Sequence, residues 1–480
     1  MGLLLVTATG ICSMMGASIN VIPFMIQKNV PGIGPYVVPA FLFAAIPAIF
    51  AAYAYAILSS AMPRAGGSYL YASRGLSPYL GFIASFSQWF GLSIVIGVIS
   101  YIIVPFIRDV FFNLGFINIS DFLEVGSVRL TISLLLIWLF VLINIVGGKV
   151  YKNTLIPMLV IMFVLGSIVL ITGLVYDQND FINSVLNSEN RVIEPTSDIK
   201  FDWKIFLTAA TLMFSSFIGF DAIAQTGNEA KNPTKNIPRA ILLAIFIVAS
   251  YYILFTISVY NIVPWSFVAD ESITKDITAP GLLSYVLPPF WGILIIIGAA
   301  IALINDLPAM ILSVSRLMFA WAKDNIFPNR VALIHSRFNT PYIAIILVGV
   351  VASIGAIGSH FAGDFFLGID IMVTSMMINF LLMCVTLISI QKVNFKLFKN
   401  ITVIKNRAIQ LFIGYTGTLI ILIFLIIHTY KDLSSNVEEW YFHSTYIYLI
   451  VMIIASIYFA LRWKTVKLKN NNTFKTLPVE

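Results

Sequence analysis

Charged residues are scarce in this sequence. Only 11% of its 480 residues are Asp, Glu, Lys or Arg, whereas a soluble domain carries roughly 25%. Hydrophobic residues make up 59% of the chain. A chain this long with so few charges cannot cover a water-soluble surface, so the lipid bilayer is its natural solvent. We therefore predict an integral membrane protein.

Cysteine and histidine are also rare. The two cysteines, Cys12 and Cys384, lie inside apolar runs, and the four histidines are scattered without the spacing of metal ligands. This pattern predicts no disulfide framework and no metal site. It also lacks a nucleophile paired with a base inside the apolar segments, which argues against a membrane enzyme. A receptor or nutrient sensor is disfavoured too, because we find no segment typical of a ligand-binding ectodomain or a signalling tail.

Long apolar segments dominate what is present. A spanning helix needs about 20 apolar residues, and the chain has twelve candidates. They lie near residues 3–27, 35–61, 79–107, 130–147, 154–175, 204–224, 239–262, 290–320, 341–359, 364–390, 408–429 and 442–462. We expect an all-α membrane protein with twelve transmembrane helices. The proline-rich loop 263–289 is expected to form short helices over an entrance.

Positive charge is distributed unevenly between the loops. With twelve spans, the loops and tail on the side of the termini hold twenty Lys and Arg, and the opposite loops hold eight, while Arg316 lies near the inner end of the eighth span. Because cytoplasmic loops are enriched in these residues, we expect a multi-pass protein of the cell membrane with both termini cytoplasmic. The net charge of +7 is thus a topology signal, and no nucleic-acid partner is expected.

The first and sixth spans contain helix-breaking sequences. Gly16, Asn20 and Pro23 interrupt the first, and small polar residues with Gly219 interrupt the sixth before Asp221. Freed backbone groups at membrane depth are tolerated where they line a cavity, and paired interrupted helices indicate a transporter site. Because these spans each begin a set of five, we predict a five-plus-five inverted repeat. Helix-packing glycines and serines are the alternative explanation.

Four motifs then resemble one family. They are GASI at 16–19, PRAGGSYLYA at 63–72, FIGFD at 217–221 with the loop to residue 240, and SRLMFAWAKDN at 315–325. In this order they resemble the amino acid–polyamine–organocation superfamily of transporters over roughly residues 3–390. The resemblance implies a transporter core at 1–390, followed by helices 11 and 12 and a cytoplasmic tail at 391–480.

The resemblance also implies substrate-binding positions. Backbone amides of Ala17 and Ser18 would receive a carboxylate, carbonyls of Met14 and Ser215 would receive an amino group, and Ile218 would line the side-chain pocket. The expected substrate site also includes Gly16, Ile19, Phe214 and Gly219.

Two positions depart from the family pattern. Ser18 stands where the family often has glycine, and Ser215 where it often has a bulky aromatic gate. We therefore expect Phe214 or Phe220 to replace that gate.

Three acidic residues, Asp221, Asp306 and Asp370, fall inside the predicted spans. A charge at the centre of a spanning helix costs roughly 2.5–3.5 kcal/mol and is a functional candidate. Asp306 precedes Pro308, which frees the carbonyl of Ile304, so Asp306 and Ile304 form a candidate site for Na⁺ or a proton. Asp221 is a second gating or coupling candidate. The alternatives are that Asp221 bonds amides of its own helix break, that Asp306 pairs with a neighbouring helix, and that Asp370 is solvated.

Together these features predict a secondary active permease for amino acids, working by symport or exchange with alternating access. A transporter of polyamines or other organic cations is the alternative. The expected partners are a small-molecule substrate and the lipid bilayer, with the protein a monomer or weak homo-oligomer. No cofactor is expected beyond a coupling Na⁺ or H⁺.

Overall fold

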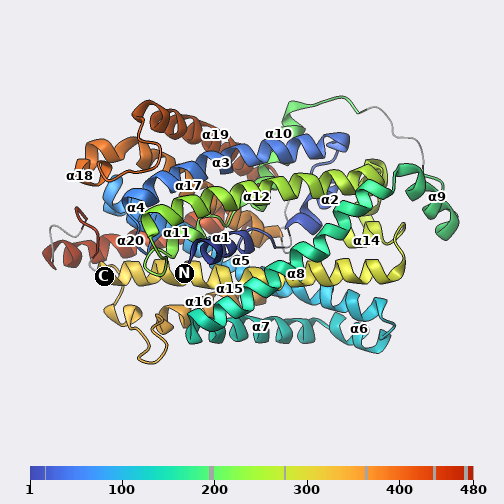
Figure 1. Ribbon diagram of the computed structural model, residues 1–480, viewed down its shortest axis with the longest axis horizontal. Coiled ribbons are helices and arrows are strands. Elements are labelled where there is room, and N and C mark those ends of the chain that lie inside the picture. Colours follow the sequence, from blue (N-terminus) through green and yellow to red (C-terminus); the bar gives the residue numbers. More distant parts are fainter. Residues whose placement is uncertain are drawn as a thin grey trace.

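The computed structural model of the protein is an elongated bundle of helices, most of which run along its long axis (Figure 1). It describes residues 1–16, 18–193, 199–274, 277–362, 366–435, 439–469 and 474–478, and these residues contain no strand. Eleven helical segments in this part of the chain are long and apolar enough to cross a membrane, and the shorter apolar helix Leu3–Cys12 precedes them. The all-α membrane architecture predicted from the sequence is confirmed.

Continuous spanning helices make up the frame of the bundle. They are α3 (Val37–Ala61), α5 (Pro78–Asn113), α7 (Gly126–Val146), α8 (Gly148–Val175), α12 (Pro233–Ile262), α15 (Pro289–Lys323), α16 (Tyr342–Ala362), α17 (Phe366–Val393), α19 (Arg407–Ser434) and α20 (Ser444–Lys469). Local sequence sets their starts. Ser77 caps α5 by accepting a hydrogen bond from the amide of Leu80, and Pro78 follows at the first helical position, where its missing N–H costs nothing.

Two spans are interrupted, as the sequence predicts. The first consists of α1 (Leu3–Cys12) and α2 (Ser18–Asn29). The sixth consists of α10 (Trp203–Met213), the 3₁₀ turn η2 (Phe214–Phe217) and the short helix α11 (Ala222–Gln225). Between η2 and α11, Ile218 is extended and Gly219 has φ +135°, which residues with a side chain rarely adopt.

The first break begins earlier than predicted. Its non-helical residues start at Ser13 and continue to Gly16, whereas Ser18 and Ile19, predicted inside the break, belong to α2. Pro23 therefore lies within a helix, and it does not set the position of the break. The backbone leaves the helix where it meets the sixth span, as described below.

Short elements close both ends of the bundle. The C-terminus and α18 (Phe395–Phe398) lie at one end, here called the C-terminal end, and α6 (Ile117–Glu124), α9 (Gln178–Glu189) and α14 (Ala279–Leu283) lie at the other (Figure 1). The predicted short helices of loop 263–289 are α13 (Trp265–Thr274) and α14. The motif at 63–72 leads into α4 (Gly67–Gly75), a wholly buried helix. The remaining elements are 3₁₀ turns: η1 (Gly34–Tyr36), η3 (Asn329–Ala332) and η4 (Trp440–Phe442).

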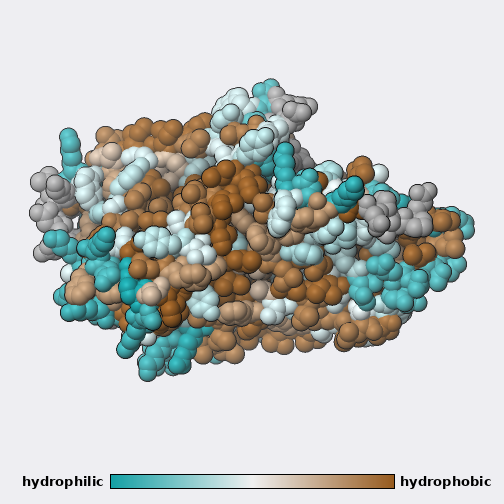
Figure 2. All heavy atoms as spheres, turned by 90° about the horizontal axis from the view of Figure 1, so that it is seen from above, coloured by the Kyte–Doolittle hydropathy of each residue, from teal (hydrophilic) through white to brown (hydrophobic). Residues whose placement is uncertain are grey.

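The surface matches a bilayer. The face shown in Figure 2 is largely hydrophobic along its middle, and hydrophilic residues are concentrated toward the two ends. Exposed large hydrophobic side chains are numerous on α7, α8, α19 and α20. In water such a surface would drive aggregation, whereas in lipid it is solvated.

Candidate functional site

The two helix breaks meet inside the bundle. A side-chain carbon built on Gly219 would collide with the carbonyl oxygen of Ser13 and approach Cγ of Met14 to 2.9 Å. Only glycine fits this contact, because of both its positive φ and its lack of a side chain. The prediction that the breaks of the first and sixth spans face each other is confirmed.

A small cavity adjoins these breaks. Its volume is about 60 Å³, which is room for roughly four water molecules, since a water needs some 10–15 Å³ by this measure. The lining residues come from five spans: Ser13, Met14, Gly16, Val21 and Ile22 from the first, Val95, Ile99 and Ile102 from α5, Ser215 and Ile218 from the sixth, Asp306 and Met310 from α15, and Ile369 and Met372 from α17. The wall is mostly apolar, with a few polar groups near the breaks.

Asp306 is the acidic side chain of this wall. It is 3% exposed, and its Oδ1 has no hydrogen-bond partner in the described part of the chain. A side-chain carbon built on Gly16 would collide with its Oδ2, so the carboxylate lies directly against the first break. Buried carboxylates are normally hydrogen-bonded or paired with a cation, and the orphaned oxygen therefore fits a bound cation or a proton.

Other polar atoms near Asp306 are also without partners in the described residues. They include the hydroxyl of Ser13 and Oδ1 of Asn305, both buried. The amide nitrogen of Asn305 contacts Cys12 Sγ at 3.0 Å, which joins α15 to the end of α1. This cysteine and Cys384 are buried free thiols, as predicted.

The two predicted carbonyl ligands already accept hydrogen bonds within the protein. Tyr252 of α12 donates its hydroxyl to the carbonyl of Met14 at 2.6 Å, and the amide of Ile218 donates to the carbonyl of Ser215 at 3.2 Å. Each carbonyl retains a second lone pair. Their roles toward a substrate amino group stay predictions.

Not all predicted substrate residues line the cavity. Ile19 faces a neighbouring cavity with Met15 and Asn20. Ile304 is half-buried in α15 and is not part of the cavity wall. Ser18 is the first residue of α2, while Ala17 and the side chain of Ser18 lie outside the described residues.

The proposed aromatic gate is also absent from the cavity wall. Phe214 and Phe220 are fully buried and pack on Phe380, with ring centroids 6.1 and 5.0 Å away. In this conformation they belong to the core between the sixth span and α17. The small Ser215 leaves Met372 and Ile369 to form that part of the wall.

Asp221 lies just beyond the cavity and is fully buried. Its Oδ1 accepts the amide of Gly219 at 3.2 Å, and its Oδ2 accepts the side-chain amide of Gln88. The carboxylate thus bonds an amide of its own helix break, as one alternative held, and it also reaches α5.

A second cavity continues from the first toward the end away from the C-terminus. The two share Ile22, Ser215 and Ile369 as lining residues. The second also contains Asn29, Asp370 and Lys431. Asp370 is thus a partly buried residue in the wall of this second cavity, and its solvation stays a prediction.

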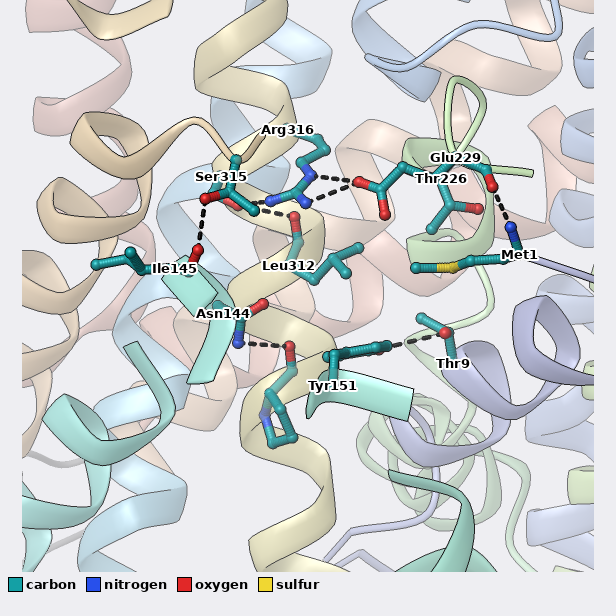
Figure 3. Close-up of polar contacts among 12 residues, drawn as sticks. Met1, Thr9, Asn144, Ile145, Tyr151, Thr226, Glu229, Leu312, Ser315 and Arg316 are labelled. Carbon is teal, nitrogen blue, oxygen red and sulfur yellow. Dashed lines mark hydrogen bonds and ion pairs between the residues drawn. The ribbon is translucent and has the colours of Figure 1, made fainter. Parts of the chain in front are cut away.

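At the C-terminal end, one partly buried and one buried ion pair join separate segments of the chain. Arg316 of α15 binds Glu229 of the loop after α11, with N–O distances of 3.0 and 2.7 Å, and the amino group of Met1 donates to the carbonyl of Glu229 (Figure 3). Arg74 of α4 pairs with Asp324 at 2.6 Å. Tyr69 donates to the same carboxylate at 2.6 Å, and burial raises the pKa of its hydroxyl well above the usual value, so it stays a donor.

Sequence reasoning missed most of the apolar wall. Val95, Ile99, Ile102, Met310 and Met372 belong to helices that are hydrophobic over long stretches. No composition or spacing separates these residues from their neighbours. Tyr252, the donor to Met14, was missed for the same reason.

Two interrupted helices that meet beside a buried cavity, in a bundle of membrane-length helices, form an arrangement typical of membrane transporters built around broken helices. The Amino acid permease family model matches residues 1–455. The chain therefore belongs to the Amino acid permease family.

Relatives agree with this assignment. An uncharacterized transporter of Mycobacterium tuberculosis is 35% identical over 152 residues, which cover 31% of this chain and 33% of that protein. The branched-chain amino acid permease of Bacillus subtilis is 27% identical over 31% of each chain. Cationic amino acid transporter 4 of Mus musculus is 29% identical over 33% of this chain and 24% of its own length. The matches thus span a third or less of each relative.

Proposed function

We propose that this protein is a secondary active permease for amino acids that works by alternating access. The observation that carries the proposal is the cavity at the contact between the two helix breaks. There the amino end of α2, whose first amides have no partner within the helix and which carries a partial positive charge, would receive a carboxylate. Carbonyls of the breaks and Asp306 would receive a positive group.

The wall of the cavity favours an apolar side chain on the substrate. Val95, Ile99, Ile102 and Met372 offer hydrocarbon surface and no hydrogen-bonding group. A cationic substrate side chain would lose its hydration against this surface. We therefore propose small aliphatic L-amino acids as the substrate class, which the branched-chain relative supports. A polyamine or other organic cation is the alternative, with Asp306 as its single buried anion in the cavity wall.

Asp306 is also our candidate for ion coupling. Its uncompensated position suits either Na⁺ or a proton, each of which would neutralise the carboxylate. The Ile304 carbonyl as a further ligand stays a prediction, because Ile304 is not in the cavity wall. Binding of the ion at Asp306 would affect the substrate site through the contact between Asp306 and Gly16.

We further propose cytoplasmic termini and a working core at residues 1–390. The asymmetry of Lys and Arg supports the orientation. Among the described residues, none after Met372 lines the central cavity, which supports the core. A fluorescent reporter at the C-terminus that is active only in the cytoplasm tests the orientation.

The experiment for function is uptake into proteoliposomes. Radiolabelled L-isoleucine, L-alanine, L-lysine and putrescine are compared under a Na⁺ gradient, a pH gradient or with internal unlabelled substrate. We expect uptake of the aliphatic amino acids above that of empty liposomes. Uptake of putrescine alone would favour the organic-cation alternative, and binding of L-isoleucine without uptake in any arm would favour a sensor.

A further inference from the structure

A chain of hydrogen bonds leaves the helix break of the sixth span and ends at α4. Asp221 accepts the side-chain amide of Gln88, which lies on α5. The carbonyl oxygen of the same Gln88 side chain accepts the hydroxyl of Ser68, near the start of α4. All three side chains have no exposed surface.

Gln88 suits this position because of its chemistry. A primary amide donates from nitrogen and accepts at oxygen, so one side chain can bridge a carboxylate and a hydroxyl. Buried polar side chains are costly unless every group is paired, and a completed network holds its members in one arrangement. Leucine or methionine would fill the same volume without joining the two elements.

The two ends of this link differ in what they contact. At one end, Asp221 also accepts a hydrogen bond from the amide of Gly219. The backbone of Gly219 lies directly against the carbonyl of Ser13, beside the central cavity. At the other end, α4 forms part of the C-terminal end. Its Tyr69 and Leu70 line a separate cavity there with Ala65 and Asn228.

Tight backbone packing accompanies the link. α4 and α11 contact each other and lie side by side (Figure 1). A side-chain carbon on Gly67 would collide with the amide group of Gln225, and one on Gly227 would collide with the backbone of Arg64. A displacement of α11 toward α4 would therefore have to move α4 or the side chain of Gln225.

We propose that Gln88 is a positioning residue that fastens α4 to the sixth-span break through Asp221 and Ser68, and so keeps the C-terminal end closed until that break moves. Binding of substrate in the central cavity would then affect α4 through the hydrogen bonds of Asp221, Gln88 and Ser68. The inference rests on the proposed transport function for its purpose, but the link itself can be tested without a substrate.

The test measures how easily the C-terminal end opens. Ala65→Cys places a thiol in the cavity beside α4, while the native Cys12 and Cys384 are buried. The rate at which a membrane-impermeant maleimide labels this introduced thiol is measured on purified protein in detergent, and the protein that retains Ala65 gives the background. Gel filtration and melting temperature confirm that each variant is folded.

Gln88→Leu and Ser68→Ala, each added to the Ala65→Cys protein, should raise the labelling rate by about fivefold or more, since Ser68→Ala removes one buried hydrogen bond and Gln88→Leu removes both bonds of the link. Combining them should add little to Gln88→Leu alone, because both break one link. Ser87→Ala is the matched control. Ser87 is the buried neighbour of Gln88, but it bonds the carbonyl of Ser375 and the hydroxyl of Tyr448. Unchanged labelling in folded Gln88→Leu and Ser68→Ala, or equal increases in Ser87→Ala, would overturn the proposal.

A second arm adds L-isoleucine. In the Ala65→Cys protein we expect the ligand to change the labelling rate, and in Gln88→Leu we expect binding within about threefold of the parent with no change in labelling. A preserved response in Gln88→Leu contradicts the link. Absence of L-isoleucine binding to the parent protein counts against the proposed substrate class, and the ligand-free rates still decide whether the link exists.

Discussion

Gly16 of the first helix break and Asp306 of α15 lie directly against each other in the wall of the central cavity. A side-chain carbon on Gly16 would occupy the space of Asp306 Oδ2. Residues 290 positions apart in the sequence thus bring the backbone of a broken helix and a carboxylate with an unpartnered Oδ1 to one place. This contact joins the proposed substrate site to the proposed ion site.

The Gly16 contact predicts a loss of function from one methyl group. Gly16→Ala should lower uptake about fivefold or more, because overpacking of this kind costs about 1–3 kcal/mol at the site. Gly358→Ala is the control, since nothing lies within 4 Å of a side-chain carbon at Gly358. Uptake and melting temperature of both variants are compared, and full uptake by Gly16→Ala would contradict the contact.

Replacing the buried carboxylate should separate binding from coupling. In Asp306→Asn, ion-dependent stimulation of uptake should fall by a factor within the usual range of about 5–150 for coupled sites. Exchange of labelled for unlabelled substrate should persist, because Asn keeps the volume of Asp. Ser313→Ala, a buried change further along α15, should retain both activities. If Asp306→Asn keeps the dependence on Na⁺ or pH of the unmodified protein, the coupling site lies elsewhere, and Asp221 is the next candidate.

The apolar wall predicts a change of substrate preference. Met372→Ala should enlarge the cavity and raise the ratio of kcat/KM for L-phenylalanine to that for L-alanine about tenfold or more, since each methylene contributes roughly 1–3 kcal/mol to discrimination. Met383→Ala removes the same atoms from a fully buried position on the same helix outside the cavity. Equal ratios in the two variants would show that Met372 does not shape the site.

Ion pairs at different depths should differ in their effect on stability. Arg74 and Asp324 are 0% and 4% exposed in their side chains, whereas Arg108 and Asp109 are 32% and 36% exposed. Asp324→Asn leaves a buried guanidinium without its carboxylate and should lower the free energy of unfolding by about 3–5 kcal/mol.

The control for this prediction is Asp109→Asn, which should change stability by no more than about 1 kcal/mol, because solvent screens the exposed pair. Denaturation in detergent followed by tryptophan fluorescence measures both variants. A smaller loss in Asp324→Asn than in Asp109→Asn would refute the importance of burial at this pair.

The sequence by itself determined the class of fold. An apolar run of membrane length has to be a helix in lipid, because no water is present to pair its backbone groups. The spans could therefore be located from composition alone. The two interrupted spans were also evident, because glycine and small polar residues at mid-span are poor helix formers whatever surrounds them.

Only the tertiary structure decided which residues meet. A soluble helix marks its buried face by alternation with polar residues, but α5 and α17 are apolar on lipid-facing and cavity-facing sides alike. Val95 and Met372 therefore carry no sequence signal of their place in the cavity wall. The exact start of the first break was not evident either: α1 ends at Cys12, beside the contact of Ser13 with Gly219, whereas Pro23 lies inside α2.

The buried polar contacts required the fold as well. Glu229 and Arg316 are 87 residues apart, and Ser68, Gln88 and Asp221 lie on three separate elements. None of these residues, taken alone in the sequence, indicates which residue it contacts. Their pairing follows from the way the breaks, α4 and α15 pack, since a buried polar group must find its partner wherever the chain brings one.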